Sequence, residues 1–336
     1  MSPGVAFAGA TVLLVVAVVW SAEVGAADLN PLRVAEALLD KIPFVRAGSG
    51  LSPLDQAILF QIRLPRVVLA ALVGGLLAIA GAGYQGVFRN VLVDSSLLGS
   101  SAGAGLGATV AIIYLDGSNP AALPIAAFLG ALLGVATAYL AGGTSRDSVT
   151  TLLLCGVSVS LFLGAVQTYL LQRSTEDLQR VYSWMLGSVA AADWRTVVSI
   201  LPYSAVSIAL LLLHGRHLDV LAVGDEEARA LGLNAGRVRL IVVAAASLAA
   251  ATAVAVSGLI GFVGIIVPHV VRRLTGPSYR VVLPLSLLGG GAFLVVADTV
   301  ARTVVAPAEL PIGVVTSFIG APAFILILRR TRLVRT

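Results

Sequence analysis

The chain has 336 residues, of which 58% are hydrophobic and only 12% are charged. Soluble domains carry about 25% charged residues, so this composition excludes an ordinary soluble enzyme and indicates an integral membrane protein. The formal net charge of +5 needs no nucleic acid to explain it, because basic residues commonly flank membrane spans on the cytoplasmic side.

Nine apolar runs are long enough to cross the roughly 30 Å hydrocarbon core of a bilayer. They cover residues 5–20, 67–88, 95–115, 117–141, 148–171, 196–213, 240–268, 281–297 and 310–328. The run 240–268 is too long for one straight span, and Ser257-Gly258 and Gly261 can divide it into a span and a shorter returning span. The runs lack the period-2 alternation of a transmembrane barrel. We therefore predict an all-α polytopic membrane protein of about ten transmembrane helices, with residues 1–336 as a single domain.

The distribution of Lys and Arg predicts the orientation of these spans. With the N-terminus inside and ten crossings, 13 of the 22 Lys and Arg residues fall on the inner side. Cytoplasmic loops carry the excess of positive charge, so we expect both termini to be cytoplasmic. No Lys or Arg precedes the first apolar run, which is therefore interpreted as a first span rather than as a cleaved signal peptide.

Three segments between the spans stand out. Residues 21–66 form a long outer loop with Pro31, Pro43 and Pro53. Residues 174–195 carry apolar residues at helical spacing from Leu178 to Met185, which predicts an outer amphipathic helix. Residues 214–239 form an inner loop with a charged centre.

Small residues recur at every fourth position in two of the runs. Gly99, Gly103 and Gly107 form one series, and Gly130 and Gly134 form another. Such ridges let helix backbones approach closely in lipid, so they predict tight helix packing rather than a phosphate-binding loop.

The charged centre of the inner loop, Gly224 to Gly232, predicts one short helix. Its first turn, residues 225–227, is acidic, as the helix dipole favours. Asp225 and Arg229 are spaced i, i+4 with the acid first, the better order for an ion pair. Gly232 can adopt the left-handed conformation that ends a helix.

The same short helix predicts a partner on the inner side of the membrane. Ala228 and Leu231 should share a small apolar face, and Glu226 adds charge beside it. A helix of two turns is marginally stable alone, so we expect this one to dock on a soluble protein.

An external energy source is also indicated by what the sequence lacks. It has no GxxxxGK[ST] motif, and its one lysine, Lys41, follows no glycine-rich loop, so the chain supplies no P-loop for ATP. Its spans are nearly free of the buried ionisable groups on which ion-coupled transporters rely. Asp298, beside Arg302, is the main candidate. The one cysteine and three dispersed histidines predict no metal and no cofactor in this chain.

Short segments in a particular order resemble the FecCD-type permeases of ABC importers, which take up iron-siderophores, haem and cobalamin. The resemblance covers about residues 55–328, and only the order and spacing of its segments together are specific. They are Gln61–Arg66, Arg89-Asn90, Leu98-Gly99, Ala102–Gly105, Trp184–Ser188, Gly224–Gly232, Ser257-Gly258, Gly261–Gly264, Pro268-His269, Ala297-Asp298, Ala301-Arg302, Glu309–Gly313 and Gly320–Pro322.

This resemblance implies a type II ABC importer permease fold in a bacterial plasma membrane. Two copies of the chain would form a homodimer, two copies of a separate P-loop ATPase would sit on the cytoplasmic side, and a substrate-binding protein would dock outside. The inner-loop helix would then be the coupling helix seated on the ATPase. One departure is that residues 90–95 lack the two prolines usual in the family, which puts the rigidity and gating role of this connection in doubt.

The resemblance also implies docking residues at the outer side. Arg63, Arg66 and Arg302 would bind acidic side chains of the binding protein, since the arginine fork grips carboxylates. Alternatively, Arg63 and Arg66 could extend into the lipid headgroup layer. Asp298 could simply pair with Arg302 one helical turn away.

Polar residues on the fifth apolar run are candidates for the transport pathway. We interpret Ser158, Ser160 and Gln167 as parts of the pathway wall, although polar residues in spans also bond neighbouring helices. Ser148, Thr150 and Thr151, at the inner end of the same run, are candidates for a cytoplasmic gate.

The leading interpretation is thus the permease subunit of an ABC importer that moves an iron-siderophore or a similar metal chelate, such as haem or cobalamin. The chain itself would not be an enzyme, because ATP would be hydrolysed on a partner subunit. An ion-coupled secondary transporter and a non-transporting membrane scaffold are the alternatives. The sequence does not distinguish among the chelates.

Overall fold

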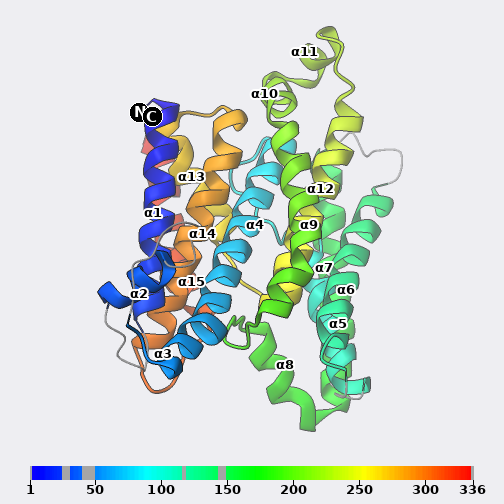
Figure 1. Cartoon of the computed structure of the whole chain (residues 1–336). Coiled ribbons are helices and arrows are strands. Elements are labelled where there is room, and N and C mark those ends of the chain that lie inside the picture. The colour runs from blue at the N-terminus through cyan, green and yellow to red at the C-terminus, as the bar shows by residue number, and fades with distance from the viewer. Residues whose placement is uncertain (1, 25–30, 40–49, 116–118, 143–148, 334–336) are drawn as a thin grey trace.

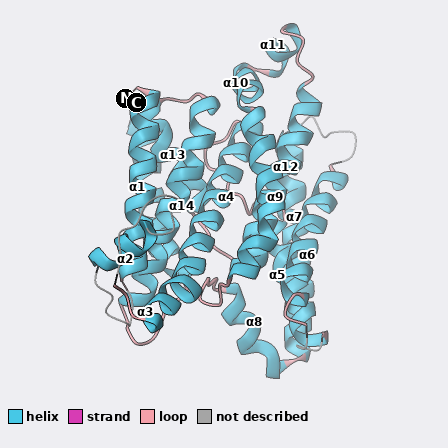
Figure 2. Ribbon diagram, in the orientation of Figure 1, coloured by secondary structure: helices cyan, strands magenta, loops and turns pink. Residues whose placement is uncertain are grey.

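A computed structural model of the protein describes residues 2–24, 31–39, 50–115, 119–142 and 149–333. Within these ranges the regular structure is entirely helical (Figure 2). The gate candidate Ser148 lies outside the described residues, and so does Lys41.

The predicted spans coincide with the long helices of the bundle (Figure 1). These helices are α1 (Pro3–Glu23), α4 (Leu64–Phe88), α5 (Ser100–Tyr114), α6 (Ala122–Ala141), α7 (Val149–Arg173), α9 (Trp194–Leu213), α12 (Ala235–Ser257), α13 (Val263–Thr275), α14 (Tyr279–Thr303) and α15 (Ile312–Leu333). Among the described residues, seven helices are by themselves long and apolar enough to cross a membrane. The prediction of an all-α polytopic membrane protein is confirmed.

The long run 240–268 is divided where its glycines predicted. Helix α12 ends at Ser257, and Gly258 follows it with a φ of 68°. A side chain at Gly258 would collide with the carbonyl oxygen of Trp184, so this reversal requires glycine for space as well as for conformation. The chain re-enters a helix at Val263, after Phe262 at a φ of 68°.

Helix α4 is the centre of the bundle, and most of its side chains are buried. Glycines bring its neighbours into backbone contact: a side chain at Gly74 would collide with Gly290 of α14, and one at Gly81 would collide with Gly264 of α13. Helices α5 and α6 cross in the same way at Gly103, as the glycine spacing predicted. Such close approaches provide the packing that holds helices together in lipid.

The first segment predicted to lie on the outer side contains more helix than the sequence indicated. The predicted loop 21–66 holds the end of α1, α2 (Pro31–Leu39), α3 (Pro53–Ala57) and a π-helical turn (Ile58–Arg63) that leads directly into α4. The described part of this segment is thus largely helical, and its placement on the outer side stays a prediction.

The predicted amphipathic helix 174–195 is shorter than expected. It comprises a 3₁₀ turn (Thr175–Asp177) and α8 (Leu178–Met185), after which the chain turns. Only part of its predicted apolar face is buried: Val181 is fully buried, whereas Tyr182 is 53% exposed.

The two ends of the bundle carry different elements. Helices α10 (Gly215–Val223) and α11 (Asp225–Ala230) project from one end, and α3 and α8 lie at the other (Figure 1). Helix α1 begins, and α15 ends, at the end that carries α11. We call this the α11 end and the opposite one the α8 end.

Candidate coupling and docking sites

Helix α11 ends in the way its sequence predicted. Gly232 has a φ of 79°, and its N–H donates to the carbonyl of Arg229. The N–H of Leu233 donates to the carbonyl of Ala228 at 2.9 Å. This pair of bonds is a Schellman motif, which satisfies the carbonyls at the end of the helix and turns the chain sharply toward α12.

Asp225 has different partners from the one predicted. Arg239, on the second turn of α12, donates to both carboxylate oxygens of Asp225 at 2.6 Å. Arg89, which follows α4, forms a second ion pair with the same carboxylate. The predicted pairing of Asp225 with Arg229 is wrong, because the side chain of Arg239 is only 4% exposed and a buried charge needs a partner far more than an exposed arginine does.

The prediction that Ala228 and Leu231 share one face is also wrong. Ala228 is fully buried within the chain, whereas Leu231 is 73% exposed. Ala228 belongs to the same apolar core as Leu221 and Val238, so it attaches α11 to its own protein. The surface that α11 presents outward consists of Glu226, Glu227, Arg229, Ala230 and Leu231.

A second carboxylate attaches the α11 end to the bundle. Asp219, on α10, accepts hydrogen bonds from the hydroxyl of Ser278 at 2.8 Å and from the backbone N–H of Tyr279 at 2.5 Å. Ser278 is the N-cap of α14, and its own side chain makes no capping bond. Asp219 therefore satisfies one of the free N–H groups that every helix start leaves, and it fixes α10 to α14.

At the α8 end, Arg66 forms the centre of an ion-pair network. Its guanidinium donates to both oxygens of Asp298 at 2.8 to 3.1 Å and to Glu309 at 2.9 and 3.0 Å. Only 12% of its side chain is exposed, against 42% for Glu309. The network joins the start of α4, the last turns of α14 and the segment that precedes α15.

The other two predicted docking arginines hold the end of α1. Arg63 donates to the carbonyls of Ala22 and Glu23 at 2.9 and 2.7 Å, and Arg302 donates to the carbonyl and hydroxyl of Ser21. Both guanidiniums thus satisfy backbone carbonyls that a helix end leaves free.

Burial corrects the docking prediction for this pair. Arg63 is 5% exposed and the side chain of Arg302 is 8% exposed, so neither is a surface charge open to a partner, and Arg63 does not extend into headgroups. The alternative pairing of Arg302 with Asp298 is present, at 3.8 Å.

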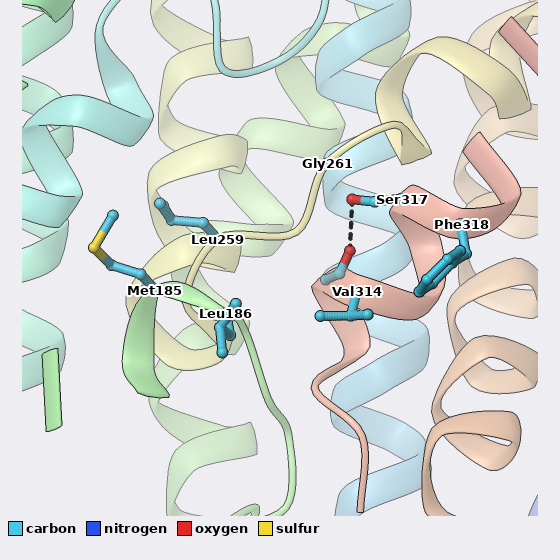
Figure 3. Close-up of a pocket in the computed structure, with 8 residues that line it drawn as sticks. Met185, Leu186, Leu259, Gly261, Val314, Ser317 and Phe318 are labelled. Carbon is cyan, nitrogen blue, oxygen red and sulfur yellow. Dashed lines mark hydrogen bonds between the residues drawn. The ribbon is translucent and has the colours of Figure 1, made fainter. Parts of the chain in front are cut away.

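A cavity of about 460 Å³ lies between the end of α8, the break after α12 and the start of α15. Its lining is mostly apolar: Met185, Leu186, Leu259, Gly261, Gly313, Val314, Ser317 and Phe318 (Figure 3). The Ser317 hydroxyl donates to the carbonyl of Gly313 at 2.7 Å. Sequence patterns predicted the helix break at Gly261 but no site beside it.

The predicted pathway residues of α7 do not line this cavity. Ser158 and Ser160 bond carbonyls of their own helix, at Leu154 and Gly156. Gln167 is buried and donates to the Thr109 hydroxyl of α5 at 3.0 Å. Gln167 also donates to the Sδ of Met185, which lines the cavity, at 3.3 Å, so its predicted role in the pathway wall stays a prediction.

Thr150, at the α11 end of α7, is exposed, and Thr151 is half-buried. Their predicted role in a gate stays a prediction.

The connection that lacks two prolines is held by side chains. The Gln85 amide donates to the carbonyls of Val93 and Gly264 at 3.1 and 3.0 Å, so it ties the connection to α13. The Asp94 carboxylate accepts from Ser96 at 3.0 Å. Burial of this carboxylate raises the pKa of Asp94, and the hydroxyls of Ser95 and Ser96 only partly oppose the rise.

Comparison with known proteins places this architecture in one family. The model of the FecCD transport family matches residues 13–330. A cobalamin import system permease protein, BtuC of Halobacterium salinarum, is 44% identical over 83% of this chain and 75% of the relative. The hemin transport system permease protein HmuU of Yersinia pestis is 39% identical over 81% and 83%.

Two further comparisons cover almost the whole chain. The iron(3+)-hydroxamate import system permease protein FhuG of Bacillus subtilis is 34% identical over 95% of both chains. A solved structure described as an inward-facing conformation of a metal-chelate type ABC transporter has a TM-score of 0.84 at 32% identity, and it covers 98% of this chain and 99% of its own. The chain therefore belongs to the FecCD transport family of membrane permeases.

Proposed function

We propose that the protein is the permease subunit of an ATP-binding-cassette importer that moves a metal chelate into the cytoplasm. The observation that carries this proposal is the surface at the α11 end. The chain belongs to a transport family but has no P-loop motif of its own, so its energy would come from a partner. At the α11 end a short helix is fixed firmly to the bundle but presents an acidic and apolar surface outward. Such a surface fits a soluble protein that supplies the energy.

The partner at this surface would be a P-loop ATPase. Glu226 and Glu227 offer carboxylates, and Leu231 offers a large exposed apolar side chain. Exposed apolar residues rimmed by charge are typical of protein interfaces. The α11 end would then face the cytoplasm, with both termini on the same side.

The cargo would be a large chelate rather than a bare metal ion. Among the described residues no group of three His, Cys, Asp or Glu side chains is placed to hold a metal, and the cavity beside α15 is lined mainly by apolar groups. Relatives carry names for cobalamin, hemin and iron(3+)-hydroxamate systems. An apolar wall suits chelates of different shapes, because it makes few specific bonds. We expect no resident cofactor.

The assembly would contain two copies of this chain, two ATPase subunits and one binding protein outside. Of the three arginines predicted for docking, Arg66 remains the candidate, because its partner Glu309 is 42% exposed. A binding protein that contacts Glu309 would reach the network of Arg66 directly.

The proposal is tested by reconstitution in liposomes. The chain is co-expressed with the ATPase and binding protein of its own import system, and uptake of a radiolabelled iron-hydroxamate, haemin and cobalamin is measured. We expect ATP-dependent uptake of one chelate class, which stops when the P-loop lysine of the ATPase is replaced. Uptake that follows a proton or sodium gradient without the ATPase would instead indicate a secondary transporter.

A further inference from the structure

We propose that Asp225 is the residue through which movement of α11 reaches the membrane helices. This inference deepens the proposed function and rests on it. The carboxylate of Asp225 is bound by two arginines from different helices, Arg239 of α12 and Arg89 at the end of α4. One side chain at the start of α11 therefore joins three elements.

Apart from Asp225, α11 is attached to its own chain by the small buried side chain of Ala228 and by the short connections at its two ends. Gly224 joins it to α10, and residues 231–234 join it to α12. A helix held at short, irregular connections can pivot about them. The ion pair with Arg239 spans 14 residues, so it closes the start of α11 onto the side of α12. The helix and its neighbour then move as one body.

The α12 arm leads from this ion pair to the cavity. Helix α12 runs without interruption from Ala235 to Ser257, and the break that follows it contributes Leu259 and Gly261 to the cavity wall. A shift of α12 along its axis would therefore displace two lining residues. The proposed coupling element is thus one continuous helix that has the ion pair near its start and the cavity wall beyond its end.

The α4 arm leads into the centre of the bundle. Arg89 follows Phe88 directly, at the C-cap of α4. Helix α4 is in backbone contact with α13 and α14 through its glycines, so these helices resist movement relative to one another. A displacement at Arg89 would therefore reach α13, the helix that follows the break.

The chemistry of the site allows the link to be strong and yet adjustable. Charge-assisted bonds to a carboxylate are about twice as strong as neutral ones, and the carboxylate lies at the start of a helix, where the dipole favours it. The side chain of Asp225 is nevertheless 29% exposed, so a partner seated on α11 would bury it further and strengthen both pairs.

The test separates binding of the ATPase from transmission of movement. Asp225→Asn keeps the shape of the side chain and removes its charge, while the outward surface of α11 stays unchanged. In the reconstituted complex we expect ATPase binding and ATP turnover to persist. We expect chelate moved per ATP hydrolysed to fall about tenfold, within the usual range of coupling between two sites.

Glu227→Gln is the matched comparison, because it makes the same chemical change on the outward surface. We expect it to weaken ATPase binding and to leave transport per ATP unchanged. Arg89→Gln removes only the α4 arm, and we expect a smaller fall in transport per ATP. If the Asp225→Asn protein fails to fold and insert into the membrane, Arg89→Gln serves as the test in its place.

Two results would overturn the proposal. One is Asp225→Asn, or Arg89→Gln in its place, with wild-type transport per ATP. The other is a loss of ATPase binding with normal transport per ATP in the complexes that remain, which would make Asp225 a contact residue. Failure of the wild-type complex to transport any chelate with ATP would instead refute the proposed function, so the two failures are distinguishable.

Discussion

The two ends of the bundle use ion pairs of opposite arrangement. At the α11 end one carboxylate, Asp225, receives two arginines. At the α8 end one arginine, Arg66, binds two carboxylates, Asp298 and Glu309. The central acid of the first group is 29% exposed, whereas the central arginine of the second is 12% exposed and its partner Asp298 is 1% exposed.

This difference indicates different roles for similar chemistry. The ion pairs of a partly exposed carboxylate become stronger when a partner covers it, because water screens a partly exposed pair more than a buried one. Buried ion pairs change in strength only when the helices around them separate. We therefore expect substitutions at the α8 end to act mainly on stability, and those at the α11 end to act mainly on communication with a partner.

The largest expected effect is that of Asp298→Leu. It leaves the guanidiniums of Arg66 and Arg302 without their shared buried carboxylate, and breaking a buried pair on one side typically costs about 3–5 kcal/mol. Urea unfolding in detergent micelles, followed by tryptophan fluorescence, measures the change. A loss below 1 kcal/mol would mean that water reaches these arginines and that the two ends are alike.

Ala228→Trp should give the next largest effect, by overpacking the site where α11 meets the core. Ala228 is fully buried, and enlarging a well-packed side chain costs about 1–3 kcal/mol. We expect limited proteolysis to cut the loop 214–239 faster, while the helices at the α8 end stay protected. Ala230→Trp, on the outward surface, is the control. Equal protease resistance in both variants would contradict the inward placement of Ala228.

Asp219→Ala tests the capping contact between α10 and α14. Loss of an N-terminal cap typically costs about 0.5–2 kcal/mol, and Asp219 provides this cap from another helix. Hydrogen exchange should quicken at the first turn of α14 and in α10 together. Faster exchange in α14 alone would show that α10 does not depend on the contact.

Glu309→Gln should have the smallest effect on stability. Its side chain is 42% exposed, and exposed ion pairs contribute about 0–1 kcal/mol. Because Arg66 retains Asp298, we expect unfolding to change little, while binding of the external binding protein becomes less sensitive to salt. Surface plasmon resonance at two ionic strengths measures this, and an unchanged salt dependence would remove Arg66 and Glu309 from the docking surface.

Helices, the helix break and the end of α11 could be predicted from local sequence patterns, because these features depend only on residues that are neighbours in the chain. The apolar runs gave the helices, Gly258 and Gly261 marked the break, and Gly232 marked the end of α11. Each of these depends on hydrophobicity over one run or on the backbone freedom of one residue. The assignment to a membrane permease family needed no more than these features and the order of the quoted segments.

Side-chain partners across the fold could not be predicted in this way. Asp225 has an arginine at i+4, yet it binds one that is 14 residues away and another that is 136 residues away. Arg63 looked like a surface charge because nothing in its neighbourhood shows that the end of α1 passes over it. The bond from Gln167 to Thr109 could not be predicted, because the sequence does not show that α5 faces this side chain.

The way α1 is held has a consequence for biosynthesis. This helix leaves the ribosome well before α14, but its C-terminal carbonyls are bound by Arg63 and by Arg302 of α14, the latter 281 residues further along the chain. The hydroxyl of Thr299 also bonds Ser21 across 278 residues. Closing so long a separation is slow and carries a loop-closure entropy. The C-terminal end of α1 therefore stays incompletely bonded until α14 has been inserted.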